Sequence, residues 1–426
     1  MRRREFVSVA GVAGLGVAFP GLVGIRANWL LIPMDGSQRN HLKAYGVTFR
    51  ALERGIASEW LLNYRGGSFL IPADGSVQRD AQLEGVTVQL IDDAEVVNIR
   101  GVIAANNMDA VVLEKAPKVA VYVPDSAAPW DDAVRMALEY AGVSYARIWD
   151  GEVMTGGLAE YEWLHLHHED FTGQYSKFFL SYAGTAWLTD MVRQNQQMAR
   201  NLGFVTVPEL KGAVAERIRG YVDGGGFLFA MCTATETLEI ALAAEGVDIA
   251  AQYADGTPMD PNATRKLSWD RTLAFTDARL ELSPATASFS DIDGHQVNNP
   301  ARREPLGVST LFDFSAKIDP VPTMLVQNHE TIIRDFYGLT TSFNKNRLKP
   351  GVTVLADQEG APWAKYIHGD FGEGTWTFLG GHDPEDPQHR INDPPTDLSL
   401  YPNSPGYRLV LNNVLFPAAK KRELKT

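Results

Sequence analysis

Residues 224–236 form the stretch that decides the fold, and they read GGGFLFAMCTATE. The glycines predict a turn, the apolar run predicts a short buried strand, and the residues from 233 to 244 predict a helix. Cys232 stands at the junction of strand and helix. Small residues flank it two positions before and after, at Ala230 and Ala234, as a tight strand–turn–helix bend requires. The stretch therefore predicts an α/β unit that presents Cys232 at the carboxyl end of a strand.

Cys232 is also the only cysteine in the chain. A helix N-terminus favours an anion through its dipole and its free N–H groups, so a thiol at this bend is expected to be acidified. The pattern therefore predicts a nucleophile, with the backbone N–H at Thr233 as an oxyanion donor. The alternative is a buried core cysteine, because unpaired cysteines are among the most buried residues.

Apolar strands alternate with helical periodicity along most of the chain. This predicts an α/β fold with a flavodoxin-like, mainly parallel sheet, in which functional residues gather at the carboxyl ends of strands. Residues 248–347 break the pattern, because Pro, Asn, Asp and Ser are frequent there. They predict a large irregular insertion that covers the strand ends like a lid. The expected strands of the core are 119–123, 145–149, 163–167, 227–231, 352–355, 365–368 and 376–379.

The same pattern divides the chain into parts. Residues 28–117 are expected to form a first α/β lobe. Residues 118–247 and 348–417 are expected to form an α/β core, interrupted by the insertion at 248–347. Residues 418–426 are expected to form a solvated basic tail.

The first 27 residues predict a signal segment. Residues 3–7 read RREFV, which matches the twin-arginine pattern, and a mildly apolar stretch follows from residue 9 to residue 23. This stretch is short for a membrane span, and cleavage is expected near Ala27. The chain is therefore expected to be a partner of the twin-arginine export machinery and to reach the periplasm or the extracellular space. The alternative is an uncleaved leader or a weak anchor.

Composition sets further bounds. The chain has 426 residues, 45% of them hydrophobic, and a formal net charge of −13. This composition is typical of a globular protein, and the negative net charge argues against a nucleic-acid partner. A single cysteine excludes an intramolecular disulfide and a multi-cysteine metal site. The oligomeric state is left open.

Residues 380–386 read GGHDPED and directly follow an expected strand. A histidine at a strand end with carboxylates close behind it has the parts of a base and its orienting acid. His382 is the candidate base, with Glu385, Asp383 or Asp386 as the acid. The alternative is a loop whose carboxylates cap turns.

The densest polar cluster is YEWLHLHHEDF at residues 161–171. On a strand, His165 and His167 point to one face and His168 to the other. Two imidazoles on one face with a nearby carboxylate such as Glu169 are able to bind zinc or another divalent metal. The alternative is a hydrogen-bonded histidine network that contacts substrate.

These segments resemble a known superfamily. The stretches LIPMD (31–35), WLLNYRGGSF (60–69), WLHLHHEDFTGQ (163–174), FAMCTAT (229–235) and GGHDPED (380–386), with residues 394–420, are similar to the class I glutamine amidotransferase-like superfamily and its ThuA-like branch. They are most similar to exported bacterial proteins catalogued as "asparagine synthetase B". The resemblance implies an amidotransferase-like core. The chain has neither an N-terminal cysteine nor an ATP-pyrophosphatase loop, which argues against synthetase activity.

Three functions follow as hypotheses. The leading one is an exported hydrolase of a small-molecule amide or ester, without a cofactor, that uses Cys232, His382 and Glu385 as nucleophile, base and orienting acid. Substrate contacts are expected from His165, His167, His168, Glu169, Thr233 and Asp383. The second is a non-catalytic or carbohydrate-binding protein in which Trp60, Trp163, Trp187 and Trp363 stack on sugar. The third is a metal-dependent hydrolase built on His165 and His167, with zinc as the metal and His382 or Asp383 as a further ligand.

Overall fold

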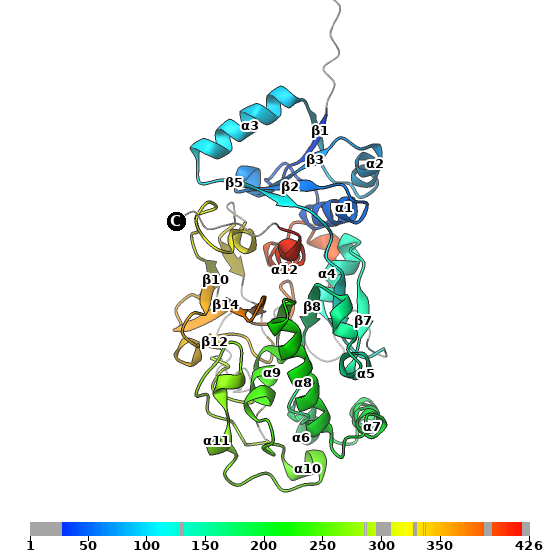
Figure 1. The fold of residues 1–426 in the computed structure, drawn as a ribbon, viewed down its shortest axis with the longest axis vertical. Helices are drawn as coiled ribbons and strands as arrows, with labels where there is room; N and C mark the ends of the chain where they lie inside the picture. Colours follow the sequence, from blue (N-terminus) through cyan, green and yellow to red (C-terminus); the bar gives the residue numbers. More distant parts are fainter. Residues whose placement is uncertain are drawn as a thin grey trace, which may run out of the picture.

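The computed structural model is elongated, with a smaller lobe at one end and a larger body below it (Figure 1). The predicted signal segment, residues 1–27, and most of the predicted tail lie outside the described residues. The structure describes residues 28–125, 127, 132–284, 286, 288–294, 308–326, 330–334, 336, 338–386 and 394–419.

The smaller lobe contains an antiparallel sheet with strand order β4-β1-β3-β2-β5. Its elements are β1 (Trp29–Ile32), α1 (His41–Glu53), β2 (Ser58–Leu62), β3 (Ser68–Pro72), α2 (Gly75–Leu83), β4 (Gln89–Ile91), α3 (Asp93–Ala105) and β5 (Asp109–Leu113). Alternate residues of β1 face opposite sides of the sheet, as the period of a strand requires. Leu30 and Ile32 pack with α1 and α2, whereas Leu31 packs with α3. Helices therefore cover both faces of this sheet.

The larger body contains a second sheet, whose path is β11-β10-β13-β14-β15-β9-β8-β6-β7, with β12 paired to β14. Its strands are β6 (Val119–Tyr122), β7 (Ala146–Ile148), β8 (Trp163–Leu166), β9 (Phe227–Met231), β10 (Val308–Leu311), β11 (Ile332–Arg334), β12 (Phe343–Asn344), β13 (Thr353–Gln358), β14 (Trp363–Phe371) and β15 (Gly374–Leu379). All seven strands predicted for the core are present.

The prediction of a flavodoxin-like, mainly parallel sheet is wrong. Parallel pairing runs only from β7 through β6, β8 and β9 to β15. The pairs from β15 through β14, β13 and β10 to β11 are antiparallel, and so is the pair of β12 with β14. Because the sheet of the smaller lobe is antiparallel throughout, the protein is a mixed α/β fold.

The connection between β14 and β15 explains the error. Only Gly372 and Glu373 separate the two strands. Two residues are enough for a hairpin, whereas a crossover between parallel strands needs a dozen or more. Gly372 has a φ of +59°, and a Cβ there would lie 2.5 Å from the backbone oxygen of Asp223. The glycine therefore permits both the turn and its close approach to a neighbouring helix.

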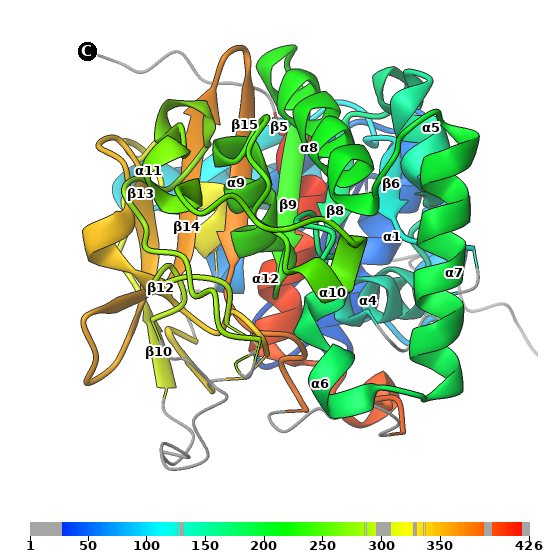
Figure 2. The same ribbon diagram turned by 90° about the horizontal axis from the view of Figure 1, so that it is seen from below.

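Helices cover both faces of the second sheet (Figure 2). They are α4 (Ala133–Ala141), α5 (Asp150–Met154), α6 (Phe179–Tyr182), α7 (Ala186–Asn201), α8 (Val207–Asp223), α9 (Ala234–Ala243), α10 (Gln252–Asp255), α11 (Ala263–Lys266) and α12 (Pro405–Leu415). α4 and α12 pack on one face together with α1, whereas α8 and α9 pack on the other. Tyr45 of α1 donates a 2.5 Å hydrogen bond to Asn412 of α12, which joins the lobe to the body. None of these described helices combines the length and the apolar composition needed to cross a bilayer.

The predicted insertion, residues 248–347, is irregular over much of its described part, but β10, β11 and β12 extend the second sheet. Two buried glutamates of α9 hold it in place. Glu239 accepts hydrogen bonds from the backbone N–H groups of residues 273–275. Glu236 accepts hydrogen bonds from the hydroxyls of Ser290 and Thr340.

Candidate functional site

The carboxyl ends of four parallel strands meet at one edge of the second sheet. β15, β9, β8 and β6 are neighbours in that order (Figure 2). The Cys232 N–H after β9 donates a 3.1 Å hydrogen bond to Gly381 O after β15. The Ala234 N–H donates one of 3.0 Å to His167 O after β8. These bonds bring Cys232, the histidines after β8 and the loop of His382 to one place, as the sequence pattern predicts.

Three histidines form a compact cluster there. One ring nitrogen of each of His167, His168 and His382 lies within 4.8 Å of those of the other two. The rings of His167 and His382 are nearly perpendicular, with centroids 4.4 Å apart. The centroid of His168 lies 5.4 Å from that of His167 and 6.1 Å from that of His382. His167 is fully buried, whereas His168 is partly exposed and so marks the more open side of the cluster.

Asp132 contacts two of the histidines of β8 and its carboxyl end, His165 and His167. Its Oδ1 is 3.4 Å from His165 Nε2 and 3.6 Å from His167 Nδ1, and the three residues form a second group with metal-ligand spacing. The Nδ1 of His165 lies 3.0 Å from the carbonyl oxygen of Phe229, which only accepts hydrogen bonds. His165 therefore contacts an acceptor at each end of its ring. It is not part of the three-histidine cluster.

Burial and neighbouring groups shift the pKa values of His167, Asp132 and Glu169. It lowers the pKa of His167 well below the usual histidine value, so the ring is neutral near pH 7. Burial by itself would raise the pKa of Asp132, but His165, His167 and backbone N–H groups lower it on balance. Burial raises the pKa of Glu169, whose Oε2 accepts a 2.9 Å hydrogen bond from the His167 N–H. A neutral imidazole is the form of histidine that binds a metal.

The histidine cluster has the chemistry that a transition-metal ion needs. Within the described residues, neither ring nitrogen of His167 makes a hydrogen bond, and the same holds for the buried Nδ1 of His168. Buried polar atoms without a partner are rare in proteins and often mark the position of an ion or water. Imidazole nitrogens suit zinc, and three protein ligands leave one tetrahedral position open. The residues therefore fit a zinc ion.

Cys232 has the predicted bend but a covered thiol. Its φ is +51°, an uncommon value for a residue other than glycine. The side chain is 2% exposed. Its sulfur lies 3.7 Å from the Thr233 hydroxyl, and the backbone of Leu339, which belongs to the predicted insertion, lies near it. Burial raises the pKa of the thiol, which opposes the expected acidification.

The two candidate acids after His382 have structural partners. Asp383 accepts hydrogen bonds from the Tyr407 hydroxyl at 2.8 Å and the Thr396 hydroxyl at 2.7 Å. Glu385 accepts one from the Ser404 hydroxyl, at the start of α12. Both carboxylates therefore attach this loop to the segment before and within α12. A role of Glu385 as the orienting acid, or of Asp383 in binding substrate, stays a prediction.

The tryptophans proposed to stack on carbohydrate differ in exposure. Trp60 and Trp163 are fully buried, and their indole N–H groups donate to the backbone oxygens of Gly67 and Asn413. Both are core residues and present no face to a sugar. Trp187 and Trp363 are partly exposed.

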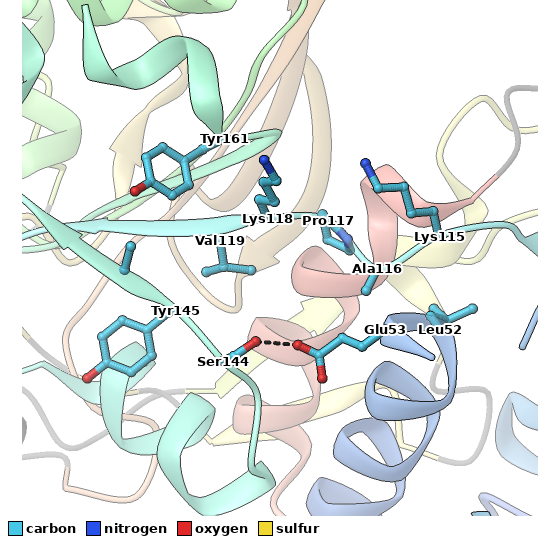
Figure 3. A pocket seen from close by; sticks show the side chains of 11 residues that line it. Leu52, Glu53, Lys115, Ala116, Pro117, Lys118, Val119, Ser144, Tyr145 and Tyr161 are labelled. Atoms are coloured by element: carbon cyan, nitrogen blue, oxygen red, sulfur yellow. Dashed lines mark hydrogen bonds between the residues drawn. The ribbon is translucent and has the colours of Figure 1, made fainter. Parts of the chain in front are cut away.

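A surface hollow of about 450 Å³ lies away from these residues (Figure 3). Its lining includes Lys118, Val119 and Ala146, at the amino ends of β6 and β7, with Tyr145 and Tyr161 beside them. It contains none of the predicted site residues. It is therefore distinct from the histidine cluster, which lies at the opposite ends of the strands.

Comparisons with known proteins assign no function. No family model and no curated protein matches the chain. Two cytoplasmic proteins of Salmonella typhimurium align with 71% of this chain and 100% of their own, at 11% and 12% identity and TM-scores of 0.34 and 0.32. The GH42 β-galactosidase Gan42B aligns with 63% of this chain and 28% of its own, at 10% identity and a TM-score of 0.25. Similarity this low supports no conclusion about fold or activity.

Sequence reasoning missed Asp132 and Leu339. Asp132 follows β6, whose carboxyl end borders the site, and it caps α4. Its place after a strand and before a helix was a usable signal. Leu339 comes from an irregular segment about 100 residues after Cys232, and no periodic pattern links the two.

Proposed function

We propose that the protein is a metal-dependent hydrolase in which His167, His168 and His382 bind a zinc ion. The observation that carries the proposal is the mutual spacing of the three imidazoles, whose ligand atoms lie within 4.8 Å of one another. The absence of hydrogen bonds at the ring nitrogens of His167 within the described residues supports it.

Each part of the site has a separate task in this proposal. The strand ends of β8 and β15 hold the ligands from two sides, and the hydrogen bonds that join the strand ends limit their movement. When bound, zinc supplies a Lewis acid and a neutral-pH source of nucleophilic water. The partly exposed His168 marks the side from which water and a small substrate with an amide or ester bond approach. The proposed substrate is a small molecule, and no nucleic acid is involved.

Metal analysis of the purified full-length protein tests the proposal. We expect about one zinc per chain after loading and dialysis, and its loss in H167Q, H168Q and H382Q. H368Q is a matched control, because His368 is a buried histidine of β14 that contacts Thr377. A wild-type protein that retains no zinc, or variants that retain as much as H368Q, would contradict the proposal.

A second candidate function is hydrolysis by the Cys232 thiolate, the reaction class that the amidotransferase-like resemblance implies. The positive φ of Cys232 between β9 and α9 favours it, because strained residues cluster at functional sites. Since the side chain of Cys232 is buried, this function requires a movement that exposes the sulfur. C232A should then abolish turnover and labelling by a thiol-directed probe. Full turnover by C232A would leave the metal-dependent reaction as the remaining candidate.

We also propose that the protein is exported by the twin-arginine machinery. The support is the RREFV sequence at residues 3–7 and the short apolar stretch that follows it. This route carries folded proteins, so a zinc ion would be bound before export. Cell fractionation tests the proposal, and equal amounts of wild type in the cytoplasm and periplasm would argue against it.

A further inference from the structure

We infer that Asp132 is a positioning residue that holds His167 in the tautomer with hydrogen on Nδ1, so that Nε2 presents its lone pair to the cluster formed with His168 and His382. The metal-binding consequence rests on the proposed function. The orientation of the ring rests on contacts that exist without a metal.

Asp132 is itself held firmly. Its Oδ1 accepts hydrogen bonds from the backbone N–H groups of Val134 at 2.8 Å and Arg135 at 3.1 Å, as the N-cap of α4. The residue is 1% exposed. A carboxylate fixed by a helix N-terminus in a buried place keeps its charge and its direction.

The carboxylate faces one end of the His167 ring. The distance from Asp132 Oδ1 to His167 Nδ1 is 3.6 Å, which is too long for a hydrogen bond, so the contact acts through charge. A negative oxygen favours a ring nitrogen that carries hydrogen over one that presents a lone pair. The neutral ring has a single hydrogen on its two nitrogens, and with that hydrogen at Nδ1 the lone pair lies at Nε2.

His165 completes the arrangement without joining the metal. Its ring lies between Phe229 O, at 3.0 Å from Nδ1, and Asp132 Oδ1, at 3.4 Å from Nε2. It stacks on the rings of Trp163 and Phe229, which fix its plane. The two histidines on one face of the β8 segment therefore have different tasks. His167 binds the metal ion, whereas His165 contacts Asp132 and helps to hold its carboxylate in place.

Metal-binding histidines almost always direct their second ring nitrogen to a carboxylate or carbonyl, and removing that partner lowers metal affinity by about 10–100-fold. Asp132 has this relation to His167. Asp132 is not part of the cluster of His167, His168 and His382, and its Oδ1 already contacts the backbone N–H groups of the helix cap and the His165 ring.

The test variant is D132S in the full-length protein. Serine is as good an N-cap as aspartate, but its shorter side chain removes the carboxylate from the histidines. D92S is the matched control, because Asp92 caps α3 through the Glu95 N–H and lies in the smaller lobe. Two measurements are made on each protein: zinc affinity by chelator competition, and the tautomer of His167 by ¹⁵N NMR of the metal-free protein labelled at histidine. H167Q identifies the signal.

We expect His167 to carry its hydrogen on Nδ1 in wild type and D92S and to become a mixture of tautomers in D132S. We expect zinc affinity to fall about 10–100-fold in D132S and to stay within about twofold in D92S. Zinc binding that is equally tight in wild type and D132S would overturn the inference and leave the proposed function standing. A wild type without zinc affinity would overturn the proposed function, and the tautomer comparison would then decide the inference alone. An unchanged tautomer in D132S would overturn it in either case.

Discussion

Cys232 provides a sharp test of the bend between β9 and α9. Its φ of +51° is a conformation that glycine adopts freely, whereas other L-residues adopt it at a cost of about 1–2 kcal/mol. Glycine usually destabilises an element relative to alanine by about 0.5–1 kcal/mol, because it loses more conformational freedom on folding. At residue 232 the two effects oppose each other, and the strain is larger. We therefore predict that C232G is more stable than C232A by about 0.5–1 kcal/mol.

The assay is equilibrium unfolding in urea. The free energies of unfolding are compared between variants for which this energy falls equally steeply with urea concentration. Both variants lack the sulfur, so no contact of the thiol contributes to their difference; the methyl group that C232A keeps favours C232A, so a more stable C232G points to the backbone. A241G in α9 is the control, and it should lose about 1 kcal/mol relative to wild type because Ala241 is helical. If C232A equals or exceeds C232G in stability, the backbone at this residue is not strained, and the argument from the bend fails.

Three further predictions concern other regions. Burial raises the pKa of Glu236 to about 8, so the folded state keeps a proton that the unfolded chain loses above about pH 4.5. The free energy of unfolding of the wild type should therefore fall as the pH rises from about 5 to 8, as measured by urea unfolding at each pH. E236Q should lose less over the same range, and an equal loss in both proteins would refute this. Gly381 and Gly351 both have a φ above +90°, but a Cβ at Gly381 would lie 2.5 Å from Phe336, whereas nothing lies within 4 Å at Gly351. G381A should thus cost about 1–3 kcal/mol more than G351A and lower zinc affinity, and equal thermal stabilities would count against the packing described. Replacement of residues 3 and 4 by lysine should retain the protein in the cytoplasm on cell fractionation, and undiminished export would exclude the twin-arginine route.

The position of the site could be predicted from the sequence because it depends on local patterns. A chemically distinctive residue comes soon after each of three bordering strands: His167 and Cys232 directly follow β8 and β9, and His382 follows β15 after two glycines. Parallel neighbours place such residues side by side. Period-two alternation also placed His165 and His167 on one face, which is how both come to face Asp132.

The direction of the strands beyond β15 was mispredicted because the hydrophobic pattern is the same for parallel and antiparallel pairs. The informative signal was the two-residue connection at Gly372, which excludes a crossover. The contacts of Glu385 with Ser404 and of Cys232 with Leu339 depend on how distant loops pack. No spacing along the chain specifies such contacts, so the roles of these two residues could not be settled from the sequence.

X-ray absorption spectroscopy at the zinc edge of the loaded full-length protein tests the three-histidine centre most directly. We predict imidazole nitrogens at about 2.0–2.1 Å from the metal and the loss of one of them in H382Q. A sulfur ligand at about 2.3 Å, or a spectrum identical to that of zinc in buffer, would contradict the proposed centre.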